Sequence, residues 1–106
     1  MFIKVIWFHQ NIEYPVLLYS ELNQIRFEKR KVEQYRNGRI GIADHDLSLN
    51  AMLGICEVPS LAEINMNQEF YGFEINKDEF ECVWNEALQK LNINNQVGDQ
   101  KCQLED

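Results

Sequence analysis

Residues 14–43, YPVLLYSELNQIRFEKRKVEQYRNGRIGIA, decide the fold that we predict for this chain. An apolar run at 16–19 precedes a charged run at 28–33, and a third short run follows the dipeptide Asn37-Gly38. Asn-Gly between two strand-like runs is a strong hairpin signal, because a type I′ turn requires positive φ at both of its central residues. The stretch therefore predicts a three-stranded antiparallel meander.

The middle strand of this meander, about Arg26–Arg36, alternates imperfectly. Phe27 and Tyr35 share one parity, whereas Val32 has the other. A β-bulge between Phe27 and Val32 would reconcile them, because one extra residue changes the face to which the following side chains point. A helix is the rival interpretation of this segment, and the Asn-Gly turn favours the strand.

Other segments add elements on both sides of the meander. Residues 2–8 are β-branched and aromatic, which is typical of a buried strand. Residues 44–50 have no periodicity and predict a loop, and residues 52–56 fit either a short strand or an irregular crossing. Ser60 and Glu63 have the spacing of a capping box, which predicts a helix of one or two turns. Residues 69–75 alternate like a short edge strand.

The clearest helix is predicted over residues 77–91, after Asn76 as N-cap and with Glu79 in its first turn. Its apolar residues recur with helical spacing and form one continuous stripe: Phe80, Val83, Trp84, Ala87, Leu88 and Leu91. Such a stripe can cover one face of a sheet. We therefore predict an α+β fold, in which an antiparallel sheet of about four or five strands is covered on one face by this C-terminal helix.

A chain of 106 residues is expected to form a single domain. We assign that domain to residues 1–92, and the composition of residues 93–106 predicts a polar C-terminal tail. No run of 18 apolar residues predicts a membrane span. The N-terminal apolar run has no basic segment before it, so we interpret it as a first strand and expect a cytoplasmic protein.

The net charge of −7 is unevenly distributed along the chain. Residues 1–42 contain seven Lys and Arg against four Glu, whereas residues 43–106 contain three Lys against thirteen Asp and Glu. An acidic half disfavours direct binding of nucleic acid and suits a basic protein partner. We therefore expect a protein partner, no nucleic acid and no membrane.

Few residues are candidates for catalysis. The chain has no Gly-rich phosphate loop, no GxSxG and no HExxH motif. Its two histidines are His9, at the end of a predicted strand, and His45, between Asp44 and Asp46, where neighbouring residues rarely converge on one site. The three cysteines have no zinc-ligand spacing. We therefore expect no enzyme, and we assign no catalytic residue, metal or cofactor.

The sequence also resembles a known family. The resemblance rests on Tyr19-Ser20-Glu21-Leu22, Arg30-Lys31-Val32-Glu33, Asn37-Gly38, Val58-Pro59-Ser60-Leu61-Ala62-Glu63-Ile64-Asn65 and Glu79-Phe80-Glu81-x-x-Trp84. These motifs are similar to those of small, acidic, single-domain bacterial proteins that are classified as a domain of unknown function. Similar small proteins serve as immunity proteins beside polymorphic or contact-dependent toxins, so the resemblance implies an inhibitor of a toxin.

The functional hypothesis is therefore an immunity protein that neutralises a bacterial toxin, a basic nuclease domain, through an acidic surface. Its predicted contact residues are five carboxylates and an aromatic anchor: Asp44, Asp46, Glu57, Glu69, Glu74 and Tyr71. The alternative is a small enzyme or ligand-binding module that uses a polar sheet face at Tyr19, Glu21, Arg30 and Glu33. A third hypothesis is an interaction subunit of a larger complex.

Overall fold

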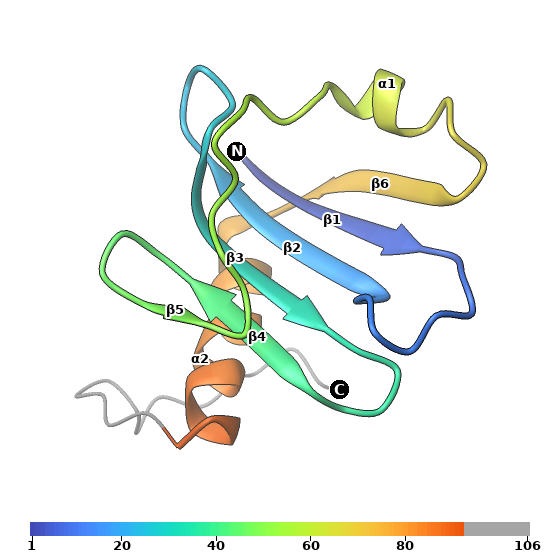
Figure 1. The fold of residues 1–106 in the computed structure, drawn as a ribbon. Coiled ribbons are helices and arrows are strands. Elements are labelled where there is room, and N and C mark those ends of the chain that lie inside the picture. Colours follow the sequence, from blue (N-terminus) through green and yellow to red (C-terminus); the bar gives the residue numbers. More distant parts are fainter. Residues whose placement is uncertain (93–106) are drawn as a thin grey trace.

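The computed structural model describes residues 1–92, which form an α+β fold (Figure 1). Its strands are β1 (Phe2–Trp7), β2 (Leu17–Leu22), β3 (Glu28–Gln34), β4 (Ile40–Ala43), β5 (Ser48–Leu49) and β6 (Phe70–Ile75). Its helices are α1 (Leu61–Ile64) and α2 (Lys77–Lys90). The polar tail that we predict over residues 93–106 lies outside the described residues.

The six strands form one antiparallel sheet in the order β5-β4-β3-β2-β1-β6. Each of β1 to β4 pairs with the next strand along the chain, and β6 returns to the remaining edge of β1 (Figure 1). The predicted meander is confirmed as β2, β3 and β4. The sheet exceeds the predicted four or five strands because Ser48–Leu49 pairs with β4, where the sequence predicts a loop. Two residues are too few to show an alternating pattern.

The predicted β-bulge in β3 is confirmed. Glu21 of β2 is opposite Arg30, whereas its neighbour Leu22 is opposite Glu28, so Lys29 is the extra residue on β3. A bulge changes the face to which the strand's side chains point. Arg30 contacts α2 through Glu81, whereas Glu28 bonds Ser20 on the other side of the sheet.

We call the two sides of the sheet the helix face, which α2 covers, and the pocket face. In Figure 1, α2 lies behind the sheet, and the chain between β5 and α1 crosses in front of it.

The Asn37-Gly38 hairpin is present, but its turn type differs from the prediction. Gly38 has φ +92°, whereas Asn37 is not among the non-glycine residues with positive φ in the described chain. Gly38 N–H donates to Tyr35 O, and Tyr35 N–H donates to Arg39 O. The loop is therefore a turn closed by a left-handed glycine that acts as a bulge residue, and it is longer by one residue than a type I′ turn.

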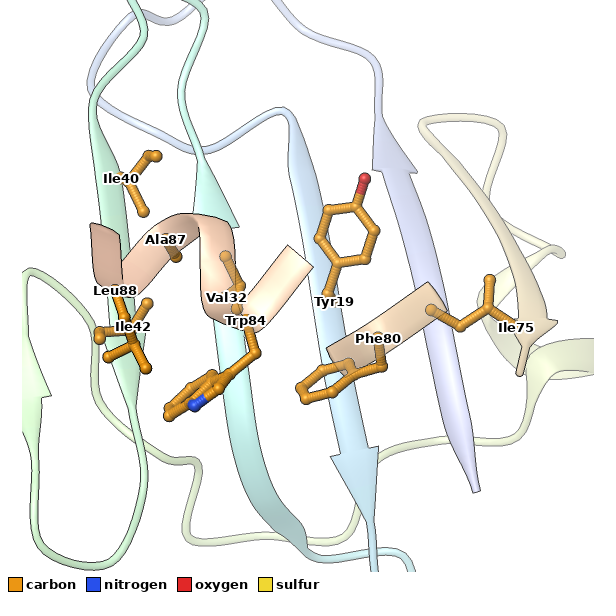
Figure 2. Close-up of a cluster of buried hydrophobic side chains, with 9 residues drawn as sticks. All are labelled: Tyr19, Val32, Ile40, Ile42, Ile75, Phe80, Trp84, Ala87 and Leu88. Carbon is orange, nitrogen blue, oxygen red and sulfur yellow. The ribbon is translucent and has the colours of Figure 1, made fainter. Parts of the chain in front are cut away.

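Helix α2 begins as predicted. Asn76 Oδ1 accepts a hydrogen bond from Glu79 N–H at 2.7 Å, which satisfies one of the unpaired amides of the first turn. The predicted apolar stripe packs on the helix face, where Figure 2 shows nine side chains meeting between α2 and the sheet. These are Tyr19, Val32, Ile40, Ile42, Ile75, Phe80, Trp84, Ala87 and Leu88. The predicted α+β fold is thus confirmed.

The pocket face holds a smaller core, built on Ile3, Val5 and Leu22. Residues 50–60 cross this face without regular structure, so the irregular crossing is confirmed for 52–56. The crossing is so close that a Cβ on Gly41 would collide with the carbonyl of Asn50. Only glycine therefore fits at position 41 of β4.

Within residues 1–92, no helix has the length and apolar character that are needed to cross a bilayer.

Truncation of Trp84, which lies at the centre of the helix face, tests this packing. We expect Trp84→Ala to lower the free energy of unfolding by about 3–5 kcal/mol, because it removes a large buried side chain and leaves a cavity. Urea unfolding followed by circular dichroism measures the change. Glu86→Ala, at an exposed position of the same helix, is the matched control and should stay within about 0.5 kcal/mol. Equal loss in both variants would contradict the assignment of Trp84 to the core.

Candidate functional site

The pocket face contains an open pocket of about 460 Å³. Ile3, Val5, Leu18 and Ser20, from the adjacent strands β1 and β2, form its floor. Its walls come from α1 and the segments next to it: Val58, Pro59, Glu63, Ile64, Asn67 and Phe70. Glu28 of β3 completes the lining. This volume lies within the range of about 300–1,000 Å³ that is typical of binding pockets.

Local sequence signals position the α1 wall. The capping box predicted from Ser60 and Glu63 is confirmed: Ser60 Oγ accepts from Glu63 N–H at 3.2 Å, and Glu63 Oε1 accepts from Ser60 N–H at 3.1 Å. Arg26 fixes the start of this wall, because its guanidinium donates to the carbonyls of Val58 and Pro59. The helix ends at Ile64 and has a single turn, within the one or two turns that the sequence predicts.

Asn65 joins α1 to the edge strand β6. Its side-chain amide accepts from Gly72 N–H at 2.6 Å and donates to Gly72 O at 2.9 Å, so it pairs with the strand as another strand would. Gly72 also lacks a side chain where Leu61 and Ile64 approach. The pocket wall and the protection of the β6 edge therefore depend on the same contact.

Three charged side chains lie beside the pocket. Lys31 Nζ is 3.1 Å from Glu28 Oε1 and 3.5 Å from Glu33 Oε2, and the exposed fractions of these three side chains are only 10–14%. Glu28 also accepts from Gly54 N–H at 2.7 Å and from Ser20 Oγ at 3.3 Å. Glu28 thus ties the crossing segment to the sheet. Because two carboxylates share one ammonium, this trio keeps a net negative charge.

A second hollow of about 320 Å³ lies between charged residues of β2 and β3 and the loop that joins β4 to β5. It is lined only by polar and charged residues: Glu21, Lys29, Arg30, Asp44, His45 and Asp46. Its two cations are already paired, since Glu21 lies 2.6 Å from Arg30 Nε and 3.7 Å from Lys29 Nζ. The apolar pocket is therefore the better candidate for a binding site.

The structure divides the predicted contact residues between two places. Asp44 and Asp46 lie between β4 and β5, whereas Glu69, Tyr71 and Glu74 lie on or next to β6, at the opposite edge of the sheet. The six residues therefore do not form one surface.

Three of these residues are on the pocket side of the sheet. Glu57 lies on the crossing segment, Glu74 is opposite Ile3, and Glu69 accepts from Trp7 Nε1. Tyr71 packs against Phe73 on the other side, that of the helix face.

The alternative polar site is not assembled as predicted. Tyr19 is buried in the core under α2, and Glu33 points to the pocket face. Glu21 and Arg30 do meet across β2 and β3, but they face α2. Among these four residues, the structure therefore brings together only Glu21 and Arg30.

Arg30 connects the sheet to α2. Its guanidinium donates to Glu21 at 2.6 Å and to Glu81 at 2.5 Å and 3.2 Å, and it lies about 5 Å from the ring centroids of Phe80 and Trp84. Burial alone lowers the pKa of Arg30, but hydrogen bonds and charge attraction from Glu81 and Glu21 outweigh it and raise that pKa above its ordinary value. Arg30 therefore stays charged wherever the protein is folded.

Two groups that matter here are not identified by the sequence reasoning. One is the Ser20, Glu28 and Lys31 cluster, which the parity change at the bulge could have indicated. The other is a set of exposed aliphatic residues on the loops next to the pocket walls, for which a linear pattern gives no signal. These residues are Ile25, Met52, Ile55 and Met66. In the part of the chain that the structure describes, no three His, Cys, Asp or Glu residues are placed to hold a metal ion.

Comparison with known proteins identifies one family. The family model named Domain of unknown function (DUF6881) matches residues 1–89. This confirms the resemblance to a family of unknown function over nearly the whole described chain. No curated protein and no solved structure matches the chain.

Removal of the Asn65 amide tests the α1 wall. We expect Asn65→Ala to lower the free energy of unfolding by about 1–3 kcal/mol, because the buried N–H and C=O groups of Gly72 lose their partners. Hydrogen exchange at the Gly72 amide should become faster, whereas the exposed neighbour variant Gln68→Ala should leave it unchanged. Wild-type exchange at Gly72 in Asn65→Ala would contradict the pairing.

Removal of the Arg30 charge tests the contact between the sheet and α2. At pH 7 we expect Arg30→Met to lower the free energy of unfolding by about 2 kcal/mol, because Glu21 and Glu81 are left without their shared cation. Arg39→Met, in the exposed hairpin, is the control. A loss no larger than that of Arg39→Met would rule out this role.

Proposed function

This chain belongs to a domain family of unknown function, and we propose that it is an immunity protein that acts in the cytoplasm. It would bind a bacterial toxin domain, a basic nuclease, and block its active site through the pocket face. An inhibitor of this kind acts by covering its target and needs no reactive group of its own.

The observation that carries this proposal is a group of exposed aliphatic side chains around the pocket. Ile25, Met52, Ile55 and Met66 are 64%, 74%, 91% and 82% exposed. All four lie on the loops next to the pocket walls: Ile25 is beside Arg26, Met52 and Ile55 are on the crossing segment, and Met66 follows α1. Exposed apolar groups on loops that adjoin an apolar pocket are typical of a protein interface.

The outer side of α2 provides the contrast. Within the described residues, none of the large apolar side chains with high exposure belongs to Lys77–Lys90. A small ligand would fill the pocket and leave the four aliphatic residues in water, whereas a protein would cover both. This favours a macromolecular partner on the pocket face.

Charge supports a basic partner. Glu28 and Glu63 line the pocket, no Lys or Arg lines it within residues 1–92, and Glu57, Glu69 and Glu74 lie on the same side. A negative surface of this kind accelerates association with a cationic groove and weakens as salt increases. A nuclease groove that binds phosphates is such a cationic surface.

The proposal predicts a toxin-like reading frame immediately upstream of the gene for this chain, and it is tested by expressing the two products together. We expect the chain to restore growth and to bind the purified, catalytically inactive toxin domain. The double variant Met52→Ser/Ile55→Ser should weaken binding about tenfold or more, because both side chains are exposed and would lie in the interface.

The matched control is Tyr71→Ser, which removes an exposed apolar side chain from the opposite face and should change affinity less than about twofold. The proposal fails if the wild-type chain neither protects cells nor binds. It also fails in its present form if Tyr71→Ser abolishes binding while the double variant binds normally, since the interface would then lie on the helix side.

A further inference from the structure

The residues that line the pocket indicate which chemical groups of the partner bind there. This inference rests on the proposed function. We infer that the toxin domain inserts one aliphatic or aromatic side chain into the pocket, next to a lysine or arginine that binds the Glu63 carboxylate. The occupant is therefore an apolar anchor with an adjacent cation on a protein surface.

The floor of the pocket requires the apolar part of this occupant. Ile3, Val5 and Leu18 form a continuous apolar surface, because they lie on neighbouring strands and point to the same face. Ser20 is the polar residue of the floor, and its hydroxyl already donates to Glu28. An apolar side chain placed here removes apolar surface from water and breaks no existing hydrogen bond.

The rim requires a cation. Glu63 Oε1 caps Ser60, whereas no bond to Glu63 Oε2 is present within residues 1–92, so this oxygen can accept from a partner while the cap stays intact. Glu28 adds a second negative charge to the lining, although its oxygens are already engaged by Lys31, Gly54 and Ser20. A phosphate or carboxylate ligand would meet both carboxylates without a free cation in the lining, which excludes an anionic occupant.

A small amine with an apolar tail would also supply an apolar group and a cation. The sides of the pocket favour a protein over such a molecule. Val58 and Pro59 continue along the chain into the segment that carries Met52 and Ile55. A partner side chain in the pocket brings the surrounding partner surface down onto these residues. The pocket is then the centre of an interface, and the carboxylates Glu57 and Glu69 belong to its rim.

Calorimetry with the inactive toxin domain tests the inference on the full chain. We expect Leu18→Ala to weaken binding about tenfold or more, because it removes part of the floor. Glu63→Gln should weaken binding about threefold to tenfold in low salt and much less in high salt, since it removes the rim charge but keeps a capping side chain. Glu86→Gln, on the exposed side of α2, is the charge-matched control and should bind as the wild type does.

Each other outcome overturns the inference. If the wild-type chain binds and both Leu18→Ala and Glu63→Gln bind equally well, the inference is wrong and the proposed function stands. If the wild-type chain does not bind, the proposed function fails and takes the inference with it. A small molecule retained in the pocket of the purified chain, detected by native mass spectrometry, would show that the occupant is not a protein side chain. A thermal melt checks that Leu18→Ala is folded. The surface variant Glu63→Gln tests binding at the pocket without a change in the core.

Discussion

The β-bulge at Lys29 is the constraint on which the rest of this structure depends. It lets two charged residues of one strand, Glu28 and Arg30, point to opposite faces of the sheet although an undisturbed strand would point them to the same one. Arg30 is thereby placed under α2, and Glu28 is placed beside the pocket. A highly charged strand can therefore lie in the middle of the sheet, because each charge finds partners on its own side.

The two faces are stabilised in different ways. On the helix face, a large apolar core packs against α2, and Arg30 closes its margin through Glu21 and Glu81. On the pocket face, a core of three buried residues is covered by a short helix and an irregular crossing segment. These are held by polar contacts: the capping box, the Arg26 bonds to carbonyls, and the amide pair of Asn65 and Gly72. The segments that cover this smaller core also carry the most exposed apolar side chains, which include Met52, Ile55 and Met66.

The sequence predicted those elements whose signals are local. The Asn37-Gly38 hairpin, the capping box at Ser60 and the stripe around Trp84 each depend on residues within a few positions, and all are present. The β-bulge was also predicted, because Phe27 and Val32 conflict in parity. The two-residue strand β5 escaped prediction because pairing with β4, and not its own residues, defines it.

The candidate site was harder to predict because it depends on chain crossings. Asp44 and Glu74 were both predicted as contact residues because of their charge. They lie near opposite edges of the sheet, since β6 returns to β1 and not to β4. The chain first crosses over β4 and β3, and residues 58–70 then enclose the pocket beside β1 and β2, a path that no linear pattern encodes. Glu33 and Arg30 look like neighbours in the sequence, but they lie on opposite faces.

The central claim is that the pocket face binds the partner. The most direct test is a titration of methyl-labelled protein with the inactive toxin domain, followed by NMR. We expect the methyl signals of Ile3, Val5 and Leu18 to change first and most. Those of Ile40, Ile42 and Leu88 under α2 should stay close to their free positions. Changes confined to the residues under α2 would contradict it.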